Sequence, residues 1–292
     1  MEKLDLNISK KWFNRFLSVM LMTLLLAIVL STATFAWYSV VNVVAINDIE
    51  FTAGSNDGGG GDLCLSWKEL GEEEYNYSLG IAPVTEKNVL YPMVPINSAE
   101  VGVTKFADFG GTKMFNKAYQ IKNSANNWVV KLDNASLTTP YTLKEKDGTA
   151  TDFFVTNKSD TDMEVTFTYE IHSDTYNVPG TAVHAEYDIV NKFRGAIFTT
   201  DGTSDEFILR GLISKDEQNI YYGQLENNKD IYDLENMSKT EEIMFIVPAK
   251  GDVKAKIIVW FDGVEMLDED GSKKIDFDMA FNGVPYVPEE VE

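Results

Sequence analysis

The sequence feature that most constrains the fold is a strict alternation of apolar and polar side chains at two places in the C-terminal half of the chain. Met163 to Ile171 alternates apolar residues with Glu and Thr, and Ile275 to Phe281 repeats the same period of two. A period of two fits a β-strand with one face in a core and the other in water. The two segments therefore predict half-buried strands rather than helices.

Similar short apolar runs, separated by turn-forming residues, recur along the rest of the chain. We expect strands at residues 37–51, 101–106, 118–122, 128–132, 153–157, 185–190, 195–199, 206–209, 243–247, 254–261 and 274–281. Residues 153–157 precede Met163 by a short polar loop, so we expect them to pair with 163–171 as a hairpin. Many short strands with frequent turns indicate an all-β fold, a jelly-roll-like β-sandwich with loop insertions.

Three regions depart from this pattern. Apolar residues recur every three positions from Ile231 onward, so the segment Asp216 to Thr240 predicts one short helix. The segment Glu69 to Ala99 is largely polar and broken by prolines, which predicts an exposed excursion from the core. Residues 133–151 are rich in turn formers and mark a possible internal boundary if the chain holds two domains.

The N-terminus carries an apolar run, Phe16 to Ala36, behind the basic residues Lys10, Lys11 and Arg15. A basic flank followed by an uncharged apolar core and then small residues is the order of an export signal. The run is also long enough for a helix that spans a bilayer, so a retained anchor is the alternative. In both cases the basic flank stays in the cytoplasm and the rest of the chain is exported.

Small residues at Thr34 and Ala36 fit a signal peptidase that cuts between Ala36 and Trp37, and a cut before Thr34 is a second option. We therefore divide the chain into residues 1–36, a signal peptide or signal anchor, and residues 37–292, an extracellular β-sandwich.

The charge and cysteine content exclude several classes of partner and site. The formal net charge is -21, so neither nucleic acid nor an anionic membrane surface is an expected partner. Cys64 is the only cysteine, which rules out an intramolecular disulfide and a thiolate zinc site. Its place in the apolar segment Leu63 to Trp67 predicts a buried structural thiol. A large exported chain without disulfides suggests a bacterial protein, and a Gram-positive cell as its source.

The sequence holds few residues that point to catalysis. Its two histidines, His172 and His184, form no His-Glu-Xaa-Xaa-His motif, and no Gly-Xaa-Ser-Xaa-Gly motif is present. We therefore expect no enzyme and no cofactor. Asp268, Asp270 and Asp276 are weak candidates for a calcium site, with an ordinary solvated turn as the simpler interpretation.

Several short segments together suggest a family: residues 33–38 at the end of the apolar run, the turn at Gly54, Leu63 to Leu65, residues 153–171, and the segments 259–263 and 275–281. They resemble the TasA/camelysin-like surface proteins of Gram-positive bacteria, although Gly58 to Gly61 form an insertion relative to the usual spacing. This resemblance implies a jelly-roll-like subunit exported to the cell surface. In some members the subunits assemble into fibres of the extracellular matrix of a biofilm by donating an N-terminal strand to a neighbour.

The segment that would be donated here is Tyr38 to Phe51. A strand freed by cleavage adds to an open sheet edge through main-chain hydrogen bonds, while its alternate side chains set the register. The apolar candidates for that role are Tyr38, Val43, Ile46, Ile49 and Phe51. The alternative is that the same strand folds back into its own sheet.

The sequence thus favours a structural protein of the cell surface whose partners are other copies of itself or other surface and matrix proteins. A membrane-anchored binding module or adhesin is the second hypothesis, with contact to the membrane through residues 1–36. An extracellular hydrolase comes third, because every motif tested for it is missing.

Overall fold

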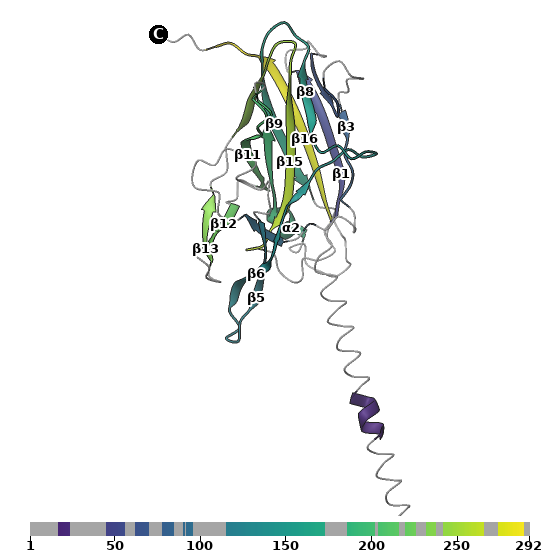
Figure 1. Ribbon diagram of the computed structural model, residues 1–292, viewed down its shortest axis with the longest axis vertical. Helices are drawn as coiled ribbons and strands as arrows, with labels where there is room; N and C mark the ends of the chain where they lie inside the picture. The colour runs from purple at the N-terminus through teal and green to yellow at the C-terminus, as the bar shows by residue number, and fades with distance from the viewer. Residues whose placement is uncertain are drawn as a thin grey trace, which may run out of the picture. The chain divides into compact units, whose positions relative to one another are not determined.

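The computed structural model describes residues 17–23, 45–55, 62–69, 78–84, 90, 92–95, 115–172, 186–201, 204–215, 220–225, 232–237, 242–265 and 274–288. Contacts between Cα atoms divide the chain into two units, Met1–Asn42 and Val43–Glu292. In the first unit a helix covers residues 17–23. The described part of the second unit is mostly β-structure, which confirms the all-β expectation (Figure 1).

One layer is a five-stranded sheet (Figure 1). Its strands, in spatial order, are β14 (Ile243–Val247), β9 (Met163–His172), β16 (Lys274–Pro285), β1 (Ala45–Ser55) and β3 (Ser78–Gly80). The two segments that alternate in the sequence become neighbours, because β9 and β16 pair antiparallel from Asp276 opposite His172 to Pro285 opposite Met163. Each buries one face as predicted; in β9, Met163, Val165, Phe167 and Ile171 are buried.

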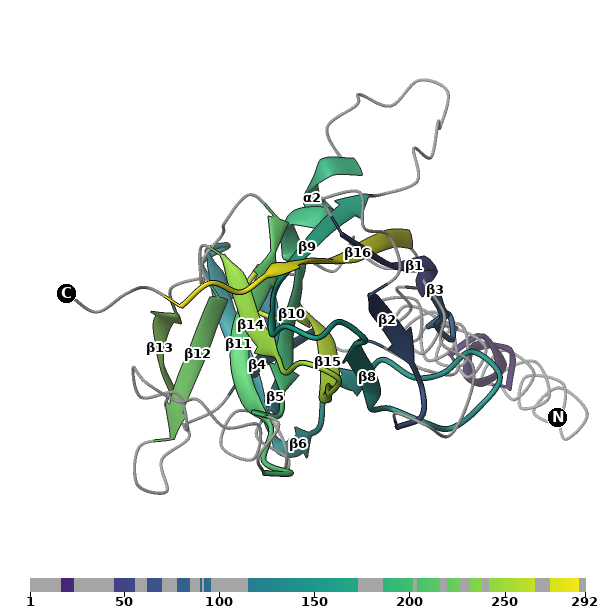
Figure 2. The same cartoon turned by 90° about the horizontal axis from the view of Figure 1, so that it is seen from above.

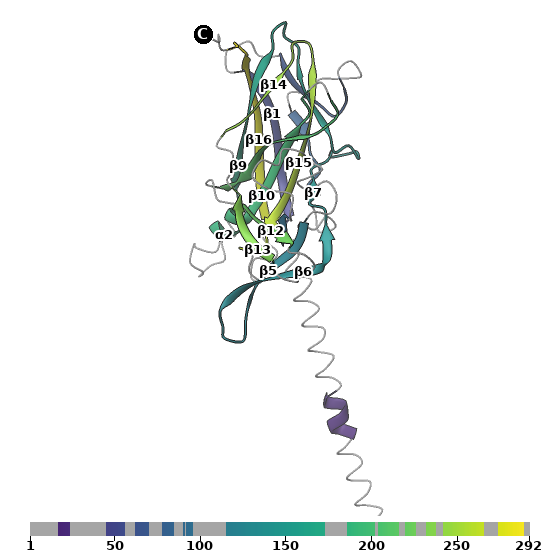
Figure 3. The ribbon, with the colours of Figure 1, turned by 60° about the vertical axis from the view of Figure 1, so that its left-hand side comes forward.

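The other layer is a nine-stranded sheet. Its main path is β11 (Ile208–Ser214), β10 (Phe193–Thr199), β15 (Asp252–Asp262), β4 (Pro92–Pro95), β5 (Phe115–Lys122) and β6 (Trp128–Thr138), with β2 (Leu63–Ser66), β7 (Tyr141–Thr142) and β8 (Phe153–Asn157) attached beside it. β15 is the central strand, because it pairs with β10 on one side and with β8, β7 and β4 in turn on the other. The β5–β6 hairpin extends away from the other strands of the layer (Figure 3).

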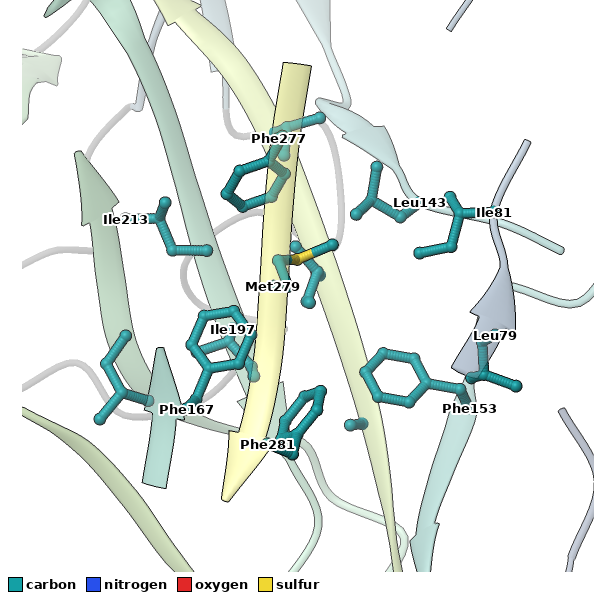
Figure 4. Packing of buried hydrophobic residues seen from close by; sticks show 14 of the residues in the cluster. Leu79, Ile81, Leu143, Phe153, Phe167, Ile197, Ile213, Phe277, Met279 and Phe281 are labelled. Atoms are coloured by element: carbon teal, nitrogen blue, oxygen red, sulfur yellow. The ribbon is translucent and has the colours of Figure 1, made fainter. Parts of the chain in front are cut away.

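The two layers pack face to face through a core rich in phenylalanine (Figure 4). Phe281 of β16 meets Phe153 of β8 with ring centroids 5.8 Å apart, and Phe277 meets Phe193 of β10 at 5.0 Å. A fully buried side chain of this size contributes roughly 1.5–3 kcal/mol relative to an exposed one. The packing of aromatic rings from both layers therefore supplies a large share of the stability of this unit.

A second apolar cluster lies on the opposite face of the nine-stranded sheet. Its buried members are Met93, Phe115, Ala196, Phe198, Leu212, Ile220, Ile258 and Trp260. Because alternate residues of β10 and β15 face this cluster and the main core, both faces of these strands are buried. That explains why β10 has no polar alternation, with every residue from Phe193 to Thr199 buried.

The predicted hairpin of residues 153–157 with 163–171 is wrong. β8 pairs with β2 and β15 in one layer, whereas β9 pairs with β14 and β16 in the other. The loop between them crosses from layer to layer. All five residues of β8 are buried, and such a strand gains more from two neighbours in the centre of a sheet than from one hairpin partner.

Two predictions of strand and helix are reversed by the structure. The segment 216–240 holds the antiparallel strands β12 (Ile220–Leu225) and β13 (Tyr232–Met237) instead of a helix. Hydrogen bonds between the two strands pair main-chain N–H and C=O groups that would be paired within the segment if it were a helix. Residues 185–190 were expected as a strand, but Glu186–Lys192 forms the helix α2, where the consecutive residues Ile189 and Val190 are both buried. Figure 2 shows α2 and the β12–β13 pair at separate places in the fold.

The described residues of the segment 69–99, namely 69, 78–84, 90 and 92–95, are also less exposed than its prolines suggested. β4 is buried at all four positions, and it pairs parallel with the end of β15 through Pro92 opposite Phe261. Its prolines stand at the two ends of the strand, where loss of an N–H is tolerated. The stretch 133–151, marked as a possible boundary, contains the end of β6 and β7; its role as a boundary stays a prediction.

Candidate functional site

The first candidate site is the N-terminal strand β1. It pairs parallel with β16 at nine positions, from Ala45 opposite Lys274 to Ser55 opposite Gly283, with an irregularity between Ile46 and Ile49. On its other side it pairs with β3 at three positions only, from Glu50 to Thr52. Most of the described main-chain pairing that holds β1 therefore comes from one strand, β16.

Only some of the residues predicted for strand donation are described by the structure. Ile46, Ile49 and Phe51 lie in β1 and have Cα partners in β16 or β3. Tyr38 and Val43, as well as the predicted cleavage residues Ala36 and Trp37, lie outside the described residues. In this structure β1 occupies a place in the sheet of its own chain.

Of the calcium candidates, only Asp276 is described. It lies on β16 opposite His172, whereas Asp268 and Asp270 are outside the described residues, as is His184. The His172 Nε2 atom lies 3.0 Å from Glu170 Oε2 and 3.8 Å from Asp278 Oδ2 on the outer face of the sheet. Within the described ranges, no group of three or more His, Cys, Asp or Glu side chains is arranged to hold a metal ion.

In the part of the chain that the structure describes, the strongest concentration of buried charge is a cluster of Arg194, Asp262 and Glu265, called here the ionic junction. Arg194 Nη2 lies 3.4 Å from Asp262 Oδ2 and 3.2 Å from Glu265 Oε2. Arg194 Nη1 donates a hydrogen bond to the carbonyl oxygen of Phe193 at 2.9 Å, and another to that of Asn191 in α2. The junction thus ties the end of α2, the start of β10 and the end of β15 together.

The turn after β15 completes the ionic junction. Asp262 Oδ1 accepts a hydrogen bond from the Val264 N–H at 2.9 Å, and the Gly263 N–H donates to the Met93 carbonyl oxygen at 3.0 Å. A Cβ atom at position 263 would lie 2.5 Å from the backbone oxygen of Ala118, so only glycine fits there. This close approach to β5 positions the turn that carries Glu265.

The protonation of Asp262 is governed by its burial. Removal from water raises the pKa of this carboxyl from 3.8 to about 7, a shift that Arg194 and the Val264 N–H oppose by favouring the charged form. Arg194 is fully buried, and the Asp262 side chain is 2% exposed. A solute therefore does not reach either group in this conformation, and the junction serves to join secondary-structure elements.

Sequence reasoning missed the ionic junction, although a signal for it was present. Arg194 follows Phe193 and precedes the apolar segment Gly195 to Phe198, and Asp262 directly follows the apolar run Ile257 to Phe261 as the last residue of β15. A charge inside an apolar strand implies a buried partner of opposite sign. Cys64, by contrast, is 1% exposed as the sequence predicted.

None of the helices in the described ranges combines the length and the apolar character that a membrane span requires. The fold and these sites define the class as an all-β protein of two packed sheets with a buried ionic junction. Comparison with protein-family models, with curated proteins and with solved structures found no match.

Proposed function

We propose that this protein is an exported structural protein of the bacterial cell surface, a jelly-roll-like subunit that assembles into extracellular fibres by exchange of its N-terminal strand. The observation that supports this function is the position of β1. It is the first strand of the second unit, and its pairing partner over nine positions is the single strand β16. We further propose that the protein is not an enzyme and needs no cofactor.

The exchange follows from how a strand is held in a sheet. Main-chain hydrogen bonds to β16 are the same whether β1 comes from the same chain or from a neighbour. The core-facing residues of β16, including Phe277 and Phe281, pack against the opposite sheet and against β9, so much of their burial does not depend on β1. A vacated place beside β16 therefore offers an edge that a second copy of β1 fits.

The second candidate, a membrane-anchored binding module, differs in what happens to residues 1–36. The N-terminal sequence of the native protein from the cell surface separates the two. A start at Trp37 leaves β1 free to be donated, and a start at Met1 keeps it tethered to the apolar segment.

Paired cysteine variants test strand exchange directly. Thr52 and Ala280 are Cα partners across β1 and β16. We expect chains carrying Thr52→Cys, mixed with chains carrying Ala280→Cys, to form a disulfide between chains under fibre-forming conditions. The matched control replaces Ala280→Cys with Thr168→Cys, because Thr168 lies opposite Ala280 on the other neighbour of β16.

A different result would show that β1 stays paired with β16 of its own chain. If the mixed chains stay unlinked while a single chain with both Thr52→Cys and Ala280→Cys closes an internal disulfide, strand donation is excluded. The absence of filaments in electron micrographs of the mature protein would count against the fibre function as a whole.

A further inference from the structure

The edge strand β14 presents an apolar surface on the outside of the five-stranded sheet. Its residues alternate, with Ile243, Phe245 and Val247 buried in the core. Met244 and Ile246 point the other way and are 42% and 41% exposed. Among the described strands β14 pairs only with β9, so its second main-chain edge has no strand partner there.

β14 lacks three of the features that usually protect an edge strand from association, namely charge, proline and a bulge. It carries no charge and no proline between Ile243 and Val247, and its pairing with β9 has no register shift. Inward charges, prolines and bulges are the usual means of blocking edge-to-edge pairing. An unprotected apolar edge of this kind is a site for strand addition.

The neighbouring edge, β11 of the other sheet, is protected. β11 and β14 lie on the same flank (Figure 2). β11 contains the charged residue Arg210, whose Nε donates to Thr199 Oγ1 at 2.7 Å, and its pairing with β10 shifts register between Ile197 and Phe198. Of the two edges on this flank, β14 is therefore the one that is open to a partner among the described residues.

We propose that β14 is a surface through which two copies of this chain pair, with the two β14 strands antiparallel and centred on Phe245. In this register Met244 of one copy lies opposite Ile246 of the other, so each exposed apolar side chain covers the other. A shift of one residue would set exposed positions against buried ones, which the pleat does not allow. The surface is therefore complementary to itself.

The charges that flank β14 favour the same arrangement. Glu242 precedes the strand and is exposed, and Lys250 follows it, where its Nζ atom already pairs with Asp160 Oδ1 at 3.1 Å. Antiparallel pairing keeps the Glu242 side chains of the two copies at opposite ends of the contact, whereas parallel pairing sets these like charges together. Such a two-fold contact uses the same residues in both copies and closes after two chains. It joins the two five-stranded sheets into one and does not depend on β1 or on the proposed strand exchange.

Single cysteines on β14 test both the contact and its register. The full chain is purified in detergent as Met244→Cys and as Ile246→Cys, with tags of different size, and the two are oxidised separately and as a mixture. We expect the mixture to form linked dimers about tenfold faster than either variant alone, because opposite residues lie closer than diagonal ones. Thr168→Cys, an exposed position on the adjacent β9, is the matched control and should stay unlinked.

Sedimentation of the variant Met244→Lys with Ile246→Lys provides the second measurement. We expect its dimerisation to weaken about tenfold or more. Because both positions are exposed, its melting temperature should equal that of the wild-type chain at concentrations where both are monomers. The inference is overturned if the wild-type chain shows no β14-linked dimer, or if the mixture links no faster than the separate variants. Links between Thr52→Cys and Ala280→Cys report strand exchange independently, so the two proposals fail or succeed separately.

Discussion

The two ends of β15 are held in place by opposite kinds of chemistry. At the C-terminal end the ionic junction uses buried charges, with Arg194 between Asp262 and Glu265. Near the N-terminal end, the neutral side chain of Asn157 makes the stabilising hydrogen bonds. One strand is thus fixed by titratable groups at one end and by a neutral amide at the other.

Asn157 satisfies all of its polar atoms without charge. Its Nδ2 donates to the carbonyl oxygens of Thr161 at 2.8 Å and Val247 at 3.2 Å. Its Oδ1 accepts from the Ser159 N–H at 2.9 Å and the Ser159 hydroxyl at 2.7 Å. Since β8 belongs to one sheet and β14 to the other, this amide ties the two layers together, whereas the ionic junction joins elements within one layer and the helix α2.

The largest effect should come from removing the cation of the ionic junction. Arg194→Met leaves two carboxylates without their partner, one of them fully buried, and should lower the free energy of unfolding by about 3–5 kcal/mol at pH 8. Denaturant titration measures this loss. Lys250→Met is the control, because its ion pair with Asp160 is exposed at 61% and 90% and should contribute little. Equal losses in both variants would contradict a special role for the junction.

The pH dependence should separate the two ends of β15 next. The pKa of Asp262 is about 7 when folded and near 3.8 when unfolded, so between these values the folded protein keeps a proton that the unfolded chain releases. The contribution of Asp262 to the free energy of unfolding is therefore fully present below pH ~4. It decreases by about 4 kcal/mol as the pH rises from there through 7.

Asp262→Asn isolates this contribution, because the other carboxylates titrate alike in both proteins. We expect the unfolding free energy of the wild type, minus that of Asp262→Asn, to fall as the pH rises from 4 to 8. Parallel stability curves for the two proteins would show that Asp262 keeps an ordinary pKa.

Asn157→Ala should have a smaller effect that does not depend on pH. The substitution leaves buried main-chain groups of the loop and of β14 without a partner, which costs about 2–3 kcal/mol. Unfolding followed at pH 5 and at pH 8 should give the same loss. A loss that differs between the two values would mean that this joint is coupled to a titrating group.

Much of the fold was predictable where one face of a strand is exposed to solvent. The period of two in β9 and β16 is visible because Glu164, Thr168 and Asp278 alternate with core residues, and the structure confirms both strands. Most of β15 and β10 was also found, because the expected ranges 254–261 and 195–199 lie within Asp252–Asp262 and Phe193–Thr199. Patterns of this kind need no knowledge of the rest of the chain.

Predictions failed where burial on both sides removes the pattern. β8 and β4 are buried throughout, so neither shows which strand it pairs with, and the expected hairpin of β8 with β9 was wrong. The segment 216–240 had a helical spacing in part, yet the pairing of Ile220 with Met237 and of Leu225 with Tyr232 made it a hairpin. Local spacing is a weak signal when a partner strand satisfies the backbone.

The sequence alone determined that this chain is an all-β protein with an apolar N-terminal segment and a buried Cys64, because these follow from periodicity, charge and composition. Only the tertiary structure decided that β8 and β9 lie in different sheets, that Arg194 meets Asp262 and Glu265, and that β14 is the last strand of the described five-stranded sheet. Strand order and buried ion pairs depend on residues far apart in the chain, and a local pattern carries no information on which distant segments meet.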